Sequence, residues 1–345
     1  MNKQRLLVAV SMMCSVMACS PGDTDAPGQA TVAPAPATVA VPSARSGSSV
    51  SSAGSNLADA LPSMIVAERG GFIPEGIEYD LANGRFLTGS LAEGTIFEIG
   101  LNGSVTPFIR DAELVSTVGI EVDEPRDRLL VTNSDSSVFQ GAGAGQAKLG
   151  VYSLTTGERF AMVDLAAVLN AGADAVFFAN DVAVADDGTA FATDTRQNVV
   201  YRVTPNYAAS VLFAFPATEG LSLNGIVYHP DGYLLVADSG NGAIYKMPIA
   251  NPAATASVRL PEPMSGADGI VWRADGALAV IQNSAEDGRV AALVSTDNWV
   301  SAQIAGVAPH DGQATTGAAV GDDIFAVQPH FNDQDPPSIH RAIFQ

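Results

Sequence analysis

The segment Asn224-Gly-Ile-Val-Tyr-His-Pro-Asp-Gly232 runs directly into Tyr233-Leu-Leu-Val-Ala237. Two apolar runs of strand length are joined here by a Pro-Asp-Gly turn, which is the pattern of two neighbouring antiparallel strands. The same opening, a polar residue followed by an apolar run, recurs at Glu75, Asn180 and Asp268. The segment therefore predicts a strand unit, and its recurrence predicts a repeat architecture.

Six apolar residues mark the repeat along the chain. They are Ile77, Ile120, Val182, Ile226, Ile270 and Ala318, and the intervals between them are 43, 62, 44, 44 and 48 residues. Four short strands in a unit of about 40–45 residues are typical of β-propellers. The sequence thus predicts an all-β fold, a six-bladed β-propeller. The long second interval predicts insertions near residues 134–148 and 165–178, and we expect the glycine-rich run 141–145 to be flexible.

The sixth unit stops one strand short of the others. Its apolar segments are residues 316–319, 324–327 and 339–344, after which the sequence ends. A spare apolar segment, residues 62–67, precedes the first unit. We expect this N-terminal segment to pair with the last blade as its outer strand, because this pairing closes the ring and removes two open edges.

Composition and charge exclude several classes of protein. The 345 residues include 17 Lys+Arg and 37 Asp+Glu, which gives a formal net charge of −20. A chain this acidic binds nucleic acid poorly, because phosphate binding requires a basic surface. The 33 glycines and 20 prolines argue against a helical bundle, and the 47% of hydrophobic residues suffices for a full-size core.

Both cysteines, Cys14 and Cys19, lie in a leader-like N-terminus. A basic start is followed by an apolar run over residues 6–17, which is too short to span a bilayer. The ending Val16-Met17-Ala18-Cys19 resembles the lipobox of bacterial lipoproteins. This resemblance implies a signal peptide over residues 1–18, a lipidated Cys19 and, because Ser20 rather than Asp follows, an outer-membrane location facing the periplasm. The alternative is an ordinary secretory signal.

Residues 19–60 have the composition of a tether. They are rich in Pro, Ala, Ser and Gly and show no apolar periodicity, so they cannot bury enough surface to offset their ordering entropy. We therefore expect a disordered tether over 19–60 and the propeller over 61–345. The expected protein is a monomer that contacts the membrane only through its lipid anchor.

Four of the unit openings resemble motifs of the senescence-marker-protein/gluconolactonase (regucalcin-like) family, whose members are six-bladed propellers related to paraoxonases. The resemblance covers about residues 70–330 and rests on Pro74-Glu75-Gly76, Phe178-Ala-Asn180-Asp181, Leu223-Asn224-Gly225-Ile226 and Ala267-Asp268-Gly269-Ile270. In that family the corresponding residues face the central channel and bind one divalent cation, usually calcium. The resemblance implies a metal site formed by Glu75, Asn180, Asn224 and Asp268.

The residue types agree with this implication. Two carboxylates and two amide oxygens form a hard-oxygen set that suits Ca²⁺, with water completing the coordination, and the repeats contain no Cys that would favour zinc. Asp181 is an alternative or additional ligand beside Asn180. The competing interpretation is that these polar residues only cap the inner strands around a wet channel.

The resemblance also implies an activity, the metal-dependent hydrolysis of a small-molecule lactone or ester. In such enzymes the metal polarises the carbonyl and a carboxylate activates water, and Asp268 is the expected general base. A paraoxonase-like alternative uses a histidine, for which His310 and His330 in late loops are the candidates. The alternative function is a non-catalytic propeller that binds a ligand or protein and uses the metal as a structural pin.

Overall fold

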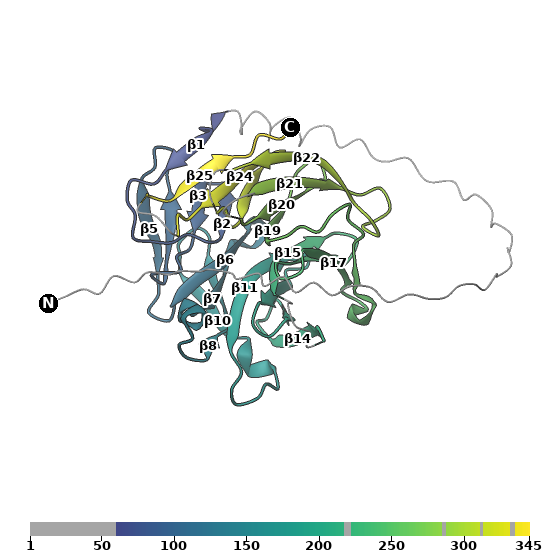
Figure 1. Cartoon of the computed structure of the whole chain (residues 1–345). Coiled ribbons are helices and arrows are strands. Elements are labelled where there is room, and N and C mark those ends of the chain that lie inside the picture. Colours follow the sequence, from purple (N-terminus) through teal and green to yellow (C-terminus); the bar gives the residue numbers. More distant parts are fainter. Residues whose placement is uncertain (1–59, 217–221, 285–287, 311–312, 332–334) are drawn as a thin grey trace, which may run out of the picture.

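Short apolar segments form six sheets, which are the blades of a β-propeller, and the four main strands of each blade are antiparallel (Figure 1). The computed structural model describes residues 60–216, 222–284, 288–310, 313–331 and 335–345. The expected leader, Cys19 and all but the last residue of the expected tether lie outside the described residues. Figure 1 shows the inner strands β2, β6, β11, β15 and β19 gathered near the centre. The predicted all-β, six-bladed fold is confirmed.

The first three blades follow one another along the chain. Blade 1 consists of β2 (Ile77–Asp80), β3 (Arg85–Thr88), β4 (Thr95–Ile99) and β5 (Val105–Arg110). Blade 2 consists of β6 (Ser116–Asp123), β7 (Arg128–Ser134), β9 (Lys148–Ser153) and β10 (Arg159–Asp164). Blade 3 consists of β11 (Phe177–Val184), β12 (Ala190–Asp194), β13 (Val199–Val203) and β14 (Ala209–Ala214), with β8 (Gly145–Gln146) beside β11.

The last three blades repeat this arrangement. Blade 4 consists of β15 (Leu223–His229), β16 (Tyr233–Asp238), β17 (Ala243–Pro248) and β18 (Ala256–Ser257). Blade 5 consists of β19 (Ala267–Trp272), β20 (Leu278–Gln282), β21 (Arg289–Val294) and β22 (Gln303–Pro309). Blade 6 consists of β23 (Gly317–Val320), β24 (Asp323–Gln328), β25 (Ser338–Arg341) and β1 (Met64–Val66).

Four 3₁₀ turns complete the described secondary structure: η1 (Glu124–Arg126), η2 (Ser136–Gln140), η3 (Ala166–Val168) and η4 (Pro252–Ala254). In the part of the chain that the structure describes, no helix has the length and apolar character needed to cross a membrane. The two predicted insertions contain η2, β8 and η3. The glycine-rich run is not wholly a flexible loop as expected, because its last residue, Gly145, starts β8 and pairs with Phe177 of blade 3.

The N-terminal strand β1 closes the ring. It pairs antiparallel with β25, with Ile65 opposite Ile339, and Figure 1 shows the purple strand alongside the yellow one. This pairing supplies the strand that the sixth unit lacks and confirms the predicted closure. Without β1, blade 6 would have only three strands and an uncovered edge at β25.

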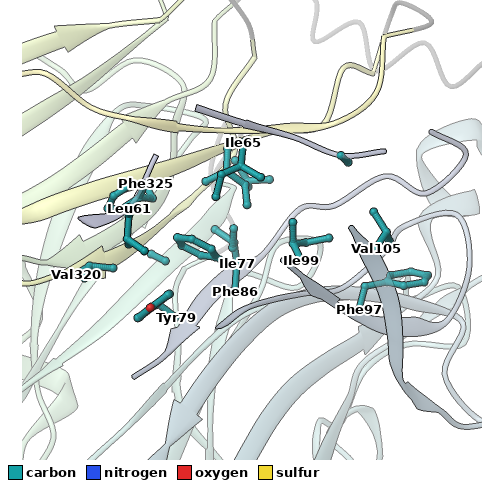
Figure 2. Close-up of a cluster of buried hydrophobic side chains, with 14 of the residues drawn as sticks. Leu61, Ile65, Ile77, Tyr79, Phe86, Phe97, Ile99, Val105, Val320 and Phe325 are labelled. Carbon is teal, nitrogen blue, oxygen red and sulfur yellow. The ribbon is translucent and has the colours of Figure 1, made fainter. Parts of the chain in front are cut away.

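Apolar side chains fill the space between adjacent blades. Each of six clusters of buried residues joins two neighbouring blades, so every sheet is covered on both faces. At the closure, Ile65 and Phe325 of blade 6 lie beside Ile77 and Phe86 of blade 1 (Figure 2). The first and last parts of the chain therefore share one core, and this core fixes the position of the inner strand β2.

The closing strand offers a direct test of this interface. Ile65 is 2% exposed, whereas Met64 on the same strand is 54% exposed. We expect Ile65→Ala to lower the free energy of unfolding by about 2–4 kcal/mol, because it removes buried surface and leaves a cavity. We expect Met64→Ala to change it by less than about 0.5 kcal/mol. Urea denaturation of both variants measures the difference, and equal stabilities contradict the packing of β1.

Candidate functional site

The inner strands of all six blades enclose a cavity of about 250 Å³ on the propeller axis. Its lining includes all four residues of the expected metal site, Glu75, Asn180, Asn224 and Asp268, and also Asp181. These residues are distant in sequence, and the ring brings them together because each stands at the start of an inner strand. The site is therefore shared by blades 1, 3, 4 and 5.

A β-bulge at the start of the inner strand presents Asn180, Asn224 and Asp268 to the cavity, whereas Glu75 lies just before the regularly paired strand β2. In β11 the pairing with β12 jumps from Ala179 to Val182, so residues 180 and 181 lie opposite Thr193 alone. An extra residue of this kind bends a strand and re-aims its side chains. The register is irregular at the same place in β6, β15 and β19. The repeated bulge thus gives four blades the same local geometry at the channel.

Threonine hydroxyls hold the bulges of neighbouring blades together. The Thr193 hydroxyl accepts the backbone N–H of Asp181 in its own blade (3.1 Å) and donates to the carbonyl of Asn224 in the next blade (2.7 Å). At the ring closure, the Thr315 hydroxyl donates to the carbonyl of Glu75 at 2.7 Å. The backbone of the site residues is therefore fixed by side chains from the preceding blade.

Close backbone contact between blades explains the glycine that follows most of these openings. A Cβ on Gly76 would lie 2.3 Å from the carbonyl oxygen of Val118 in blade 2. A Cβ on Gly225 would lie 2.6 Å from the carbonyl oxygen of Asp268 in blade 5. Real Cβ atoms do not approach backbone atoms so closely, so a side chain at either position would separate two inner strands.

Asp181 occupies the position that glycine occupies in the other blades. Its carboxylate accepts the backbone N–H of Ile226 in blade 4 at 3.0 Å and that of Val182 at 2.9 Å. The side chain therefore makes the contact between blades 3 and 4. It also adds a third carboxylate to the site, next to Asn180, as the sequence allowed.

Two further carboxylates line the cavity, Glu78 of blade 1 and Glu121 of blade 2. Each directly follows its blade's aligned apolar residue, Ile77 or Ile120. The corresponding residues of the other four blades are Ala183, Val227, Val271 and Ala319. Our sequence analysis missed this pair, although the aligned repeats contain the signal: two acids at a position that is otherwise apolar.

Residues just after the second strand orient two of the site side chains. The amide nitrogen of Asn283 donates to a carboxylate oxygen of Asp268 at 2.9 Å. In blade 3 the amide nitrogen of Asn180 donates to the Thr195 hydroxyl, also at 2.9 Å, which leaves the amide oxygen of Asn180 as its acceptor group. Asp268 and Asn180 are only 7% and 5% exposed, so both are held in defined positions.

Enclosure in the channel raises the pKa of every carboxyl group in the site. Burial raises the pKa of Asp268 to about 7, although hydrogen bonds from Asn283 and Asn224 oppose the shift. Burial also raises the pKa of Asp181 to about 7, against the effect of its two backbone N–H donors. Burial, followed by the charges of Asp268 and Asp181, raises the pKa of Glu75 well above its ordinary value.

The second pair of acids behaves in the same way. Burial raises the pKa of Glu78 to about 8, and the charge of Asp181 adds to the shift. Burial and the charge of Glu78 raise the pKa of Glu121 well above its ordinary value. The channel thus contains five carboxyl groups whose negative charges are mutually unfavourable at neutral pH.

The donor set of the four expected residues fits a hard divalent cation. Carboxylates that raise one another's pKa are relieved by a nearby positive charge, and the Asn180 amide is oriented with its nitrogen already engaged. Across the described residues, no three Asp, Glu, His or Cys side chains are grouped closely enough to hold an ion by themselves. An ion here therefore depends on amide oxygens as well as on Glu75 and Asp268.

The two candidate histidines lie elsewhere. Neither His310 nor His330 belongs to the lining of the cavity. The backbone N–H of His310 donates to Gly288, and the His330 ring lies 3.2 Å from the Ser338 hydroxyl. The cavity therefore offers carboxyl groups, not imidazoles, for proton transfer.

Comparison with solved structures identifies the fold. A gluconolactonase from Xanthomonas campestris superposes with a TM-score of 0.57 at 16% identity and covers 82% of this chain and 89% of its own. The fold is that of the gluconolactonase and regucalcin propellers. A calcium-binding regucalcin from Agrobacterium tumefaciens gives a TM-score of 0.55 at 16% identity, with 82% and 94% coverage.

The same fold also carries other chemistry. Virginiamycin B lyase from Staphylococcus aureus superposes with a TM-score of 0.54 at 12% identity, covering 81% of this chain and 98% of its own. No family model and no curated protein matches the sequence. At these identities the superpositions establish the fold, and the function rests on the site residues.

The raised pKa values predict an unusual pH dependence of stability. Because the folded, metal-free protein binds more protons than the unfolded chain between about pH 4 and pH 8, its free energy of unfolding falls as pH rises through this range. We expect the melting temperature in chelator to drop by about 5 °C or more from pH 5 to pH 8. We expect Glu78→Gln to weaken the dependence of the melting temperature on pH. A melting temperature that rises from pH 5 to pH 8 contradicts the raised pKa values of the channel carboxyl groups.

Proposed function

We propose that this protein is a divalent-cation-dependent hydrolase of the gluconolactonase type, which acts on a lactone or ester, with Ca²⁺ as the working ion. The observation that carries the proposal is the set of four oxygen-bearing side chains that the starts of the inner strands bring to one cavity: Glu75, Asn180, Asn224 and Asp268. The similarity in fold to a gluconolactonase and to a calcium-binding regucalcin supports the proposal.

In this proposal Glu75, Asn180, Asn224 and Asp268 hold the ion. When bound, the cation supplies a Lewis acid that polarises the substrate carbonyl and stabilises developing negative charge. Asp268 is the general base that accepts a proton from water, because it is a buried carboxylate in the same cavity as the other three ligand groups. Asn283 holds the Asp268 carboxylate in position for this transfer.

The wider proposal rests on the sequence. We propose a monomeric lipoprotein, lipidated at Cys19 and tethered to the bacterial outer membrane on its periplasmic side, without a nucleic-acid partner. The basic start, the short apolar run and the Ala-Cys pair support the anchor. The charge of −20 supports the absence of a nucleic-acid partner.

The metal site is tested by calorimetric titration of chelator-treated protein with CaCl₂. We expect wild type to bind one ion, with a rise in melting temperature by mass action. Glu75→Gln and Asp268→Asn each remove a charge with little change in shape, and we expect each to weaken binding at least about tenfold. Glu121→Gln is the matched control, because it removes a carboxylate from the same cavity outside the proposed ligand set.

Turnover is measured on a panel of lactones and aryl esters, with calcium and with chelator. We expect calcium-dependent hydrolysis by wild type and a loss of about 10²–10⁴ in kcat for Asp268→Asn at saturating calcium, because the base is removed. Calcium binding without hydrolysis of any substrate favours the non-catalytic alternative, with the metal as a structural pin. Absence of divalent-cation binding contradicts the site itself.

The anchor is tested by expressing full-length wild type and Cys19→Ser in a Gram-negative host. We expect wild type to fractionate with the outer membrane and to carry a lipid on Cys19 by mass spectrometry, because the thiol is the acceptor of the lipid. We expect the variant to leave the membrane fraction. Unlipidated wild type in the soluble periplasm contradicts the lipoprotein assignment.

A further inference from the structure

The insertion in blade 2 lies at the end of the channel where the inner strands begin. Because the strands of each blade are antiparallel, the loop between the second and third strands lies beside the start of the inner strand. In blade 2, Ser134 at the end of β7 pairs with Ser116 at the start of β6. Residues 135–147 come after Ser134 and therefore stand at the mouth that leads to Glu75 and Asp268.

This insertion is fixed to the blades on either side. The Ser136 hydroxyl donates to the carbonyl of Leu91 in blade 1 at 3.2 Å. At its other end, β8 runs parallel to β11 of blade 3, with Gly145 opposite Phe177. Attachment to three consecutive blades gives its side chains defined positions over the mouth.

A buried apolar cluster supports the insertion at blade 2. The residue at the position of Glu75 in this blade is Val118, which packs with Val138 of the insertion and Phe178 of blade 3. None of these three side chains lines the cavity, to which blade 2 contributes Glu121 and its two neighbours. The cluster therefore holds the insertion in place beside the mouth.

An exposed aromatic ring and a guanidinium group lie beside this cluster. Phe139 is 42% exposed, and its ring packs edge-on against Phe178 with centroids 4.7 Å apart. The guanidinium carbon of exposed Arg196 lies 5.8 Å from the Phe139 ring centroid. Within the described residues no carboxylate pairs with the Arg196 side chain, although the protein carries a net charge of −20.

Phe139 and Arg196 lie near Asn180 through intermediate residues. Phe139 packs on Phe178, which precedes Asn180 by two residues, and Arg196 follows Thr195, whose hydroxyl accepts from the Asn180 amide. An anionic group is repelled by the channel carboxylates and attracted by a guanidinium that no described carboxylate neutralises. An exposed ring beside that guanidinium offers a face for an apolar or aromatic group.

We propose that Phe139 and Arg196 form a substrate subsite at the channel mouth, which binds the apolar, anionic end of a substrate whose ester or lactone bond enters the channel. This inference rests on the proposed hydrolase function and adds the substrate class: a carboxylic acid that carries an aromatic or aliphatic group. Phe139 contacts the apolar part, and Arg196 pairs with the carboxylate.

The test uses two matched aryl esters, 4-acetoxybenzoate and its neutral analogue 4-acetoxy-N-methylbenzamide, each corrected for its rate with hydroxide. We expect wild type to favour the carboxylate by about tenfold in kcat/KM, the size of one charge-assisted contact near the surface. Arg196→Gln brings the ratio to about one. Phe139→Ala lowers kcat/KM several-fold for both esters, because both contain the ring.

Matched controls come from the rim of the propeller. Arg110→Gln and Phe160→Ala remove an exposed guanidinium and an exposed ring from outer strands, and we expect both variants to keep the wild-type ratio and rates. The subsite proposal is overturned if wild type shows no preference for the carboxylate, or if Arg196→Gln retains that preference. Neither result contradicts the hydrolase proposal.

A binding measurement separates the subsite from catalysis. If wild type hydrolyses neither of these two esters, calorimetry with 4-hydroxybenzoate decides the subsite, and the hydrolase proposal is judged on the whole panel of lactones and esters. Binding that Arg196→Gln abolishes and Arg110→Gln retains supports the subsite without catalysis. No binding of 4-hydroxybenzoate to wild type in that case overturns the subsite as well.

Discussion

The bulge at the start of the inner strands is the constraint on which the site depends. A regular strand would send residues 180 and 181 to opposite faces of the sheet, but the bulge lets both line the cavity. The second residue of the bulge determines how closely the neighbouring blades approach. This residue is Gly225 in blade 4 and the carboxylate-bearing Asp181 in blade 3. Threonine hydroxyls from the preceding blade hold the backbone carbonyls of Asn224 and Glu75, which couples the position of these residues to the ring.

That geometry concentrates negative charge where solvation is poor. Five carboxyl groups from blades 1, 2, 3 and 5 face one cavity, and their pKa values rise because the channel walls shield them from bulk water. Such an arrangement opposes stability unless protons or a cation neutralise it. The burial that raises the pKa of Asp268 in the metal-free channel also favours a neutralising cation there, which links the stability of the channel to its proposed chemistry.

Blade 2 departs from the other blades in ways that bear on the substrate. Its inner strand places Val118 where Glu75 stands in blade 1, and its loop is long enough to reach blades 1 and 3. The repeat therefore supplies the ring and the four oxygen-bearing side chains, while the exception within the repeat supplies the insertion that carries Phe139, whose ring lies beside Arg196 of blade 3. Local departures from a symmetric scaffold are a common source of specificity, because they leave the fold intact.

The sequence alone determined the blade count, the closure by residues 62–67 and the positions of Glu75, Asn180, Asn224 and Asp268, since a repeat aligns equivalent residues and a ring must close. Only the tertiary structure decided which other groups share the cavity. Asn283 and Thr195 orient Asp268 and Asn180 from the loop after the second strand of the same blade. Glu78 and Glu121 belong to different blades, so only the ring brings both into one cavity. The contact of Phe139 with Arg196 likewise joins an insertion in blade 2 to a turn in blade 3, which no local pattern encodes.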